Sequence, residues 1–235
     1  MRIAEIEIRY TDGNGQRQQR RPRLQLREMP VRGIVNDRIQ KVRFQVKSNG
    51  TLEWDSRATP DIITIGNAMA RTPTGLVQLR KLDEAKYPIK MKISPAMTSK
   101  YGYFEPERAS TRNESFVRMA TLYIYENEIR KYILGVQGGG VSITRNRLID
   151  LEDAYAYFGW YEILLGMTGS HEAEHSDIGN IQLSIDTPNQ RYPTKFDPPW
   201  EQVPYDISLK VAEEEYNNLS SDDREKVDNF IQSIN

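Results

Sequence analysis

Cysteine is absent from this chain of 235 residues, and only two histidines are present. The lack of cysteine excludes disulfides, thiol nucleophiles and zinc sites with cysteine ligands. Long apolar runs are also missing, and the longest, such as residues 163–165, are only a few residues long, so we expect no membrane span. The first ten residues lack the apolar core of roughly 7–15 residues that marks a signal peptide. The sequence leaves the localisation of the protein open.

The composition is that of a folded globular protein. Hydrophobic residues make up 38% of the chain and charged residues 28%, which separates it from disordered sequences. A chain of this length can bury a sizeable core as one large domain or two small ones.

The net charge of −1 conceals a gradient along the chain. Residues 1–50 hold 12 Lys/Arg and 5 Asp/Glu, whereas residues 150–235 hold 5 and 18. Such asymmetry can mark a nucleic-acid arm or an acidic partner surface, although two oppositely charged faces of one domain are the simpler interpretation. The arginine-rich stretch 17–27 has no interleaved aromatic residues to stack on bases, so we expect a charged hairpin face and no nucleic-acid partner.

The apolar pattern predicts a mixed α+β fold. Alternating residues in the first 55 positions predict short strands joined by turns at TDGNGQ and SNG. We therefore expect a β-rich amino-terminal region over residues 1–55, which can pack on the same domain, followed by a second domain over residues 56–235.

In the second region, helical spacing and capping residues alternate with strand patterns. Helices are predicted over residues 61–71, 75–84, 150–165 and 200–219, with a short terminal helix after Ser220 or Ser221. Strands are predicted over 90–93 and 120–129, and loops over 98–115 and 181–199.

Both histidines lie in the stretch HEAEH, residues 171–175. On a helix, positions i and i+4 share a face, so His171 and His175 can bind one ion. Glu172 lies about 100° around the helix and can accept a proton from a water molecule that the ion activates. Because this arrangement uses every histidine of the chain, we interpret it as a Zn²⁺ site. A solvated helix start with an incidental spacing is the alternative.

At these residues the chain resembles the zincin metallopeptidases, and in particular the gluzincins. The resemblance implies a small sheet with an edge strand above the site and an active-site helix that carries the motif. The strand over 120–129 is the best candidate to bind an extended substrate by β-augmentation, and an ordinary interior strand is the equal alternative. The chain departs from the pattern at Glu174, where zincins usually have an uncharged residue, and at Ser176 and Asp177, where they usually have apolar residues. Gly169 and Ser170 precede the motif and allow the helix to start late.

The third metal ligand must be a carboxylate, because no other histidine and no cysteine remains. A gluzincin-like site requires a glutamate from a following helix. We favour Glu201, which the neighbouring Trp200 would anchor, while Asp206 and Glu213 stay open as alternatives. Asp177 could orient a histidine, although a simple turn aspartate is favoured.

The resemblance implies a zinc-dependent peptidase in which Glu172 acts as general base and then general acid. Residues 56–219 also resemble the compact metallopeptidase domains at the ends of bacterial polymorphic and secreted toxins. That resemblance implies delivery by a specialised secretion system, a protein target, and an immunity or inhibitor protein as a partner. A non-catalytic protein-binding module and a phage or mobile-element structural protein, each with an incidental motif, are the alternatives.

Overall fold

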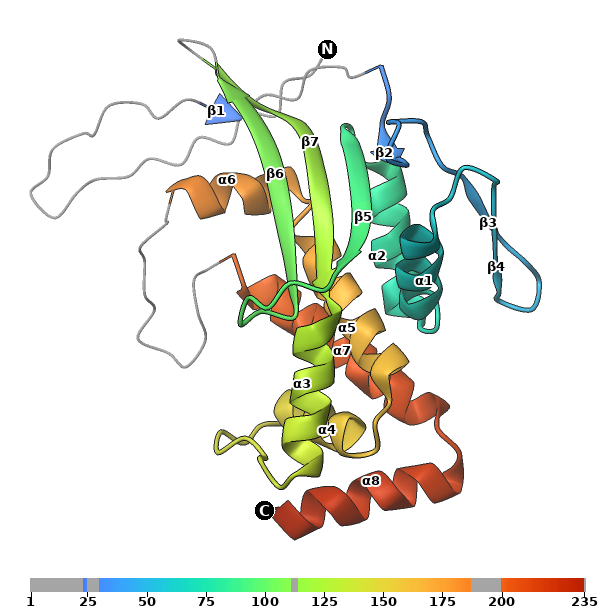
Figure 1. The fold of residues 1–235 in the computed structure, drawn as a ribbon, viewed down its shortest axis with the longest axis vertical. Helices are drawn as coiled ribbons and strands as arrows, with labels where there is room; N and C mark the ends of the chain where they lie inside the picture. Colours follow the sequence, from blue (N-terminus) through green and yellow to red (C-terminus); the bar gives the residue numbers. More distant parts are fainter. Residues whose placement is uncertain (1–22, 25–29, 111–113, 187–199, 235) are drawn as a thin grey trace, which may run out of the picture.

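The structure, a computed structural model, describes residues 23–24, 30–110, 114–186 and 200–234. One five-stranded sheet packs against helices, and a further group of helices extends beyond the end of the sheet (Figure 1). The mixture of helices and strands agrees with the predicted α+β class. The first predicted hairpin and most of the arginine-rich stretch 17–27 lie outside the described residues.

The sheet is parallel except for one strand. Its order is β1 (Arg23–Leu24), β7 (Glu114–Tyr125), β5 (Pro88–Ser94) and β2 (Gly33–Ile34). The remaining strand, β6 (Gly102–Ser110), pairs antiparallel with β7. Since Thr121 of β7 pairs with both β5 and β6, these two strands flank β7 on opposite sides.

Strand β7 is therefore an interior strand of the sheet. Its buried residues Leu122 and Ile124 alternate with the half-buried Tyr123 and Tyr125, as expected for a strand with one face on the core. Of the two interpretations of residues 120–129, the interior strand is the correct one. The strand ends at Tyr125, and a helix begins at the next residue.

The predicted loop over residues 98–115 is wrong, because this segment contains β6 and the start of β7. Among the described residues, β6 is an edge strand. Its exposed Glu105 and Glu107 and its central Pro106 are typical of an edge strand, where charges and proline limit edge-to-edge aggregation. These residues also remove the apolar alternation by which a strand is recognised in a sequence.

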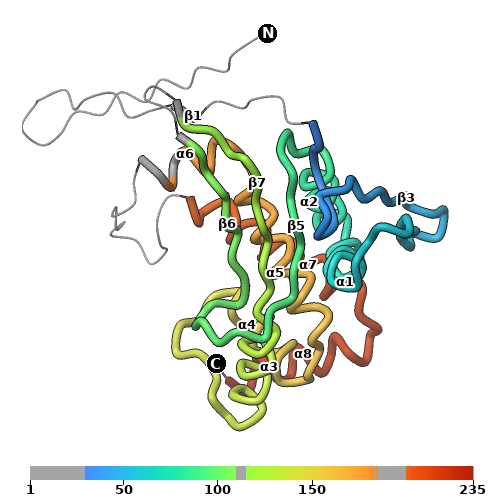
Figure 2. Tube along the Cα trace, turned by 45° about the horizontal axis from the view of Figure 1, so that its top comes forward, coloured from blue at the N-terminus to red at the C-terminus, as the bar shows by residue number. Residues whose placement is uncertain are grey.

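The amino-terminal region contributes to the same sheet, since β2 pairs with β5. It also forms an antiparallel hairpin of β3 (Phe44–Val46) and β4 (Leu52–Trp54), visible beside α1 in Figures 1 and 2. The hairpin packs on α1 through Trp54, because a Cβ atom placed on Gly66 would lie only 2.3 Å from its ring.

Eight helices lie in the described part of the chain. They are α1 (Pro60–Met69), α2 (Pro73–Glu84), α3 (Glu126–Gln137), α4 (Arg147–Tyr157), α5 (Tyr161–Glu174), α6 (Ile178–Asp186), α7 (Gln202–Asn218) and α8 (Ser221–Ile234). The single helix predicted over 150–165 is two helices, because Gly159 adopts a φ of +72° that ends α4 before α5 begins. The loop predicted over 181–199 is also partly wrong, since α6 extends to Asp186. None of these helices has the length and apolar character to cross a membrane.

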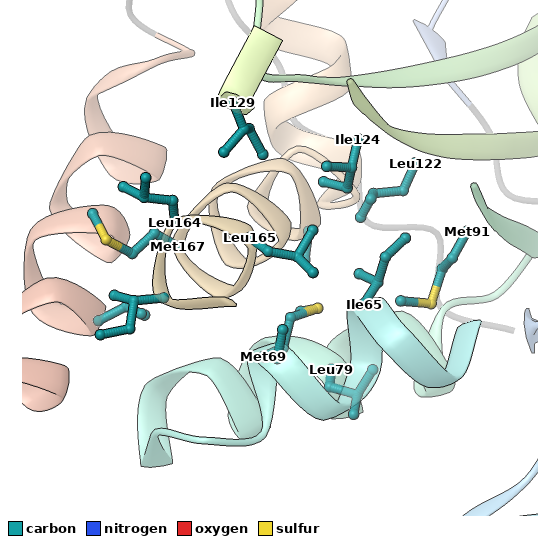
Figure 3. Close-up of a cluster of buried hydrophobic side chains, with 14 of the residues drawn as sticks. Ile65, Met69, Leu79, Met91, Leu122, Ile124, Ile129, Leu164, Leu165 and Met167 are labelled. Carbon is teal, nitrogen blue, oxygen red and sulfur yellow. The ribbon is translucent and has the colours of Figure 1, made fainter. Parts of the chain in front are cut away.

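Helix α5 lies against the centre of the core. Figure 3 shows Leu165 of α5 near Met69 and Ile65 of α1, with Leu122 and Ile124 of the sheet on the other side. Burial of such side chains stabilises the fold by about 1.5–3 kcal/mol each.

Two glycines of α5 bring this helix unusually close to α1. A Cβ atom on Gly166 would lie 2.6 Å from the carbonyl oxygen of Ala68, and one on Gly169 would lie 3.0 Å from Cγ of Met69. Close packing at these positions fixes the helix that carries the HEAEH motif.

Candidate metal centre

The HEAEH motif occupies the carboxyl-terminal end of α5. The helix already begins at Tyr161, so the expectation that it starts late is wrong. Ser170 is buried in the helix, and its hydroxyl donates to the Gly166 carbonyl at 2.7 Å. This bond satisfies the buried hydroxyl inside the helix, so the serine does not interrupt it. His175, the C-cap residue, keeps a right-handed helical conformation. The two imidazoles therefore share one face, with ring centroids 5.3 Å apart.

Glu201, at the N-cap position of α7, points its carboxylate at both histidines. Its Oε2 atom lies 3.1 Å from Nε2 of His171 and 3.4 Å from Nε2 of His175. One ligand atom from each of these three residues lies within 4.8 Å of the other two. The structure thus brings together the three residues that the sequence analysis selected.

The other acidic candidates lie elsewhere. The carboxylate of Asp206 accepts a hydrogen bond from Gln202 at 3.3 Å, and Glu213 lies 3.9 Å from Arg147. Asp177 accepts a hydrogen bond from the Gly179 amide at 2.7 Å, so it is the turn aspartate that the sequence favoured.

The outer nitrogen of each imidazole has its own hydrogen-bond partner. Nδ1 of His171 lies 3.1 Å from the hydroxyl of Ser208 on α7. Nδ1 of His175 lies 3.0 Å from Oδ1 of Asn180 on α6. Partners of this kind fix the ring orientation and the tautomer of metal-binding histidines.

The Asn180 contact assigns the tautomer of His175. Nδ2 of Asn180 donates to the Trp200 carbonyl at 2.8 Å, which orients its Oδ1 toward the imidazole. An amide oxygen only accepts, so Nδ1 of His175 carries the hydrogen, and Nε2 of the neutral ring presents a lone pair. That lone pair faces an oxygen of Glu201, which is also an acceptor. A proton or a metal cation between the two atoms resolves this conflict.

The donor set fits a zinc ion. Two imidazoles and one carboxylate are ligands that zinc accepts, at about 2.0–2.2 Å. Ligand atoms at that distance in a tetrahedral arrangement are separated by roughly 3.3 Å. The two distances from Glu201 Oε2 to the histidine nitrogens, 3.1 and 3.4 Å, match this value.

The charges of the three groups are mutually dependent. Burial by itself raises the pKa of Glu201, but hydrogen bonds from His171 and His175 outweigh it and hold the pKa well below the usual value. Burial lowers the pKa of His175, whereas its contacts with Glu201, Glu172 and Asn180 raise it, with a net rise. The carboxylate is therefore ionised and available as an anionic ligand.

Glu172 lies beside the three-residue cluster and does not join it. It is 7% exposed, and burial raises the pKa of its carboxyl group. The two histidines and a backbone hydrogen bond from Phe104 of β6 act in the opposite direction. A carboxyl group with a raised pKa next to a candidate metal site is suited to accept a proton and return it.

A cleft of about 1110 Å³ opens above these residues. One wall is β6 with the residues just before it, and the floor is formed by one face of α5. Helix α4 lies at one end of α5 and α6 at the other (Figures 1 and 2). The cleft is lined by His171, Glu172, His175 and Glu201, and also by Tyr205, whose ring packs edge-on against His171 at 5.4 Å.

Sequence reasoning missed four features of the site: the edge strand β6, Gly102 within it, Asn180 and Ser208. Asn180 follows His175 by five residues, on the next helix, and its proximity to the motif is a signal that could have been used. Ser208 lies seven residues after Glu201, which is two helical turns, so both residues lie on the same face of the helix. Once Glu201 is chosen as a ligand, Ser208 can therefore be predicted to lie near the same histidines.

Comparisons with protein-family models, with curated proteins and with solved structures give no match.

Proposed function

We propose that this protein is a zinc-dependent peptidase with a zincin-like arrangement of sheet and active-site helix. The observation that carries the proposal is the convergence of His171, His175 and Glu201. Their ligand atoms come from two helices, with an ionised carboxylate and a histidine whose neutral tautomer presents a lone pair to it. A solvated helix start with an incidental spacing would not be expected to have this geometry.

His171, His175 and Glu201 would hold the ion, and Ser208 and Asn180 would orient the imidazoles. The bound zinc would supply a Lewis acid that polarises the scissile carbonyl and acidifies water. Glu172 takes a proton from the attacking water and delivers it to the amine nitrogen when the C–N bond breaks. Its closeness to both histidines, and its raised pKa, support this role.

Among the described residues no second strand pairs with β6 beside β7, and this edge supports a peptide as the substrate. The amide of Tyr125 donates to the carbonyl of Tyr101, so odd-numbered residues of β6 pair with β7. The backbone groups of the even-numbered Gly102 and Phe104 therefore point away from β7, toward the cleft, where the Phe104 amide donates to Glu172. An extended peptide can bind there as an added strand, which would place its backbone above α5.

The toxin-type delivery and the immunity or inhibitor partner stay predictions that rest on the resemblance of residues 56–219. The two alternatives, a protein-binding module and an assembly protein, require neither zinc nor a base. Metal content and turnover therefore distinguish the peptidase from both alternatives.

The test combines metal analysis with hydrolysis of an unfolded protein such as reduced casein. The wild-type chain should hold about one zinc ion and cleave casein. His171→Ala should lose the metal, and Glu172→Gln should keep it and lose turnover by at least a thousandfold.

Glu174→Gln is the matched control within the same motif. Glu174 contacts Lys81 and Gln78 and does not line the cleft, so this variant should keep both zinc and activity. Failure of the wild-type protein to bind zinc at micromolar concentration would contradict the proposal. Full activity of Glu172→Gln would contradict the assigned base.

A further inference from the structure

One end of the cleft carries a carboxylate that the proposed chemistry does not use. Glu152 of α4 lines the cleft together with Leu148 and Ile149 of the same helix and Tyr101 before β6. Helix α4 stands at the end of α5 that is remote from α6 (Figure 1). Glu152 therefore belongs to the α4 end of the cleft, whereas His171 and His175 belong to the carboxyl-terminal end of α5, which α6 follows.

The charges around Glu152 leave it without a counter-ion. Its neighbours Asp150 and Asp153 share Arg145, whose guanidinium lies 3.2 and 3.0 Å from their carboxylates. Lys100 also lines the cleft, but its ammonium group lies over the ring of Tyr103, 4.6 Å from the ring centroid.

Asp153 is fully buried and satisfied. It accepts hydrogen bonds from the Tyr132 hydroxyl at 2.6 Å and from the Ser142 amide at 3.1 Å, in addition to Arg145. By contrast, none of the residues that the structure describes forms a hydrogen bond or an ion pair with the Glu152 carboxylate. The two adjacent acids thus differ, since Asp153 holds the loop before α4 and Glu152 faces the cleft.

An unpaired acid in this position is unfavourable in the absence of a partner. Burial raises the pKa of Glu152 to about 7, and the negative charge of Asp153 adds to the effect. Folded proteins usually pair such groups, because an isolated ionised carboxylate loses its hydration. A cation that enters the cleft would restore the ionised form and form an ion pair with this half-buried carboxylate.

The surroundings of Glu152 suit a long side chain with a charged end. The rings of Tyr101 and Tyr132 lie 5.3 Å apart, and Tyr101 is 41% exposed. Tyr101, Leu148 and Ile149 line the cleft and form an apolar wall against which the methylene groups of lysine or arginine can pack. Aromatic faces also attract cations, by about 0.5–2 kcal/mol.

We propose that the α4 end of the cleft is a subsite for a cationic side chain of the peptide substrate, with Glu152 as the counter-ion. This inference rests on the proposed peptidase function, which it deepens. It makes the protein selective for peptides with arginine or lysine at one position near the scissile bond. An acid without a ligand, buried only as a consequence of the fold, would give no selectivity.

The direct test is a binding measurement that needs no turnover. The full-length Glu172→Gln protein is titrated with L-argininamide and with L-citrullinamide, which has nearly the same shape and no side-chain charge. Chemical shifts of the Tyr101 and Ile149 amides report binding. We expect argininamide to bind at least fivefold more tightly than citrullinamide, and Glu152→Gln in the same background to abolish that preference.

Glu107→Gln is the matched control, because Glu107 lies on β6, pairs with Arg118 and does not line the cleft. This variant should keep the preference for argininamide. Equal binding of the two amides, or a preference that survives Glu152→Gln, would overturn the proposal.

A second measurement separates this inference from the peptidase proposal. The active protein is given a peptide mixture with randomised positions, and the cleaved products are sequenced. Enrichment of arginine or lysine at one position, lost in Glu152→Gln while uncharged peptides are cleaved at the same rate within twofold, supports the subsite. Cleavage without any cationic preference overturns the subsite and leaves the peptidase proposal standing. A preference for argininamide in the binding measurement, without cleavage of any peptide, overturns the peptidase proposal and leaves the cationic subsite standing.

Discussion

Gly102 of β6 and Glu172 of α5 lie in direct contact. A Cβ atom on Gly102 would lie 2.6 Å from Cγ and 2.9 Å from Oε1 of Glu172. The side chain of Thr168 closes the same space, with its Cγ2 atom 2.8 Å from that position. Because Gly102 has no side chain, the carboxylate of Glu172, the proposed base, can occupy the space beside β6.

Replacement of Gly102 by alanine should displace Glu172 and leave the metal ligands in place. We expect kcat to fall about 10–100-fold with zinc content unchanged, because small displacements of a catalytic group are costly. The control is Gly135→Ala in α3, where an added Cβ meets no atom within 4 Å. Unchanged kcat in Gly102→Ala would show that Glu172 is not held by this contact.

Asn180 and Ser208 should affect metal binding without touching the ion. Asn180→Ala and Ser208→Ala remove the partners of the two Nδ1 atoms, and we expect zinc affinity to drop about 10–100-fold in each. Competition with a chromogenic chelator measures this change. Ser184→Ala is the comparison, since its hydroxyl donates to the Ile181 carbonyl and not to a histidine. Affinities equal to wild type in both variants would show that these contacts do not orient the rings.

Glu152 predicts a pH dependence of stability. In the folded protein the pKa of this carboxyl is raised to about 7 by burial and by Asp153, whereas in the unfolded chain it is about 4.3. The folded state binds more protons between these values, so the free energy of unfolding falls as the pH rises from about 4.3 to 7.

Glu152→Gln should remove this loss of stability. We expect the variant to match wild type near pH 4 and to be more stable by about 2 kcal/mol at pH 8, a value reduced for partial exposure of the side chain. Urea unfolding at the two pH values measures the difference. Glu53→Gln, with a 62% exposed side chain, should show no such change. A constant difference between wild type and Glu152→Gln at all pH values would contradict the raised pKa.

The Arg71–Glu215 pair should stabilise the junction of α1 and α7. Two nitrogens of Arg71 lie 2.8 and 3.1 Å from the two oxygens of Glu215, which is 2% exposed. Glu215→Ala should lower the free energy of unfolding by about 2 kcal/mol, less than for a fully buried pair because Arg71 can reach water. Glu213→Ala, 3.9 Å from Arg147 and half exposed, should cost about 0–0.5 kcal/mol. Chemical denaturation of both variants provides the comparison, and equal effects would contradict this assignment.

The sequence could predict His171 and His175 from local chemistry, whereas the choice of Glu201 over Asp206 and Glu213 rested on the resemblance to gluzincins and on the neighbouring Trp200. Two histidines at helical spacing, and the absence of any further histidine or cysteine, left a carboxylate as the remaining ligand. The helices also followed from apolar spacing, and Thr59 and Thr72 are the residues that cap α1 and α2.

Features that depend on long-range packing could not be predicted in this way. Strand β6 is polar on its exposed side, and its position at the edge follows only from its pairing with β7. The break at Gly159 requires a positive φ that the helical periodicity of the flanking residues conceals. Likewise, Gly102 looks like a loop residue until its distance to Glu172 is known.

The most direct test of the central claim is an anomalous difference map, recorded at the zinc absorption edge from crystals grown with one equivalent of zinc. The account predicts a single strong peak about 2.0–2.2 Å from Nε2 of His171, Nε2 of His175 and a carboxylate oxygen of Glu201. A map without a peak between these side chains, or with the zinc bound elsewhere, would contradict it.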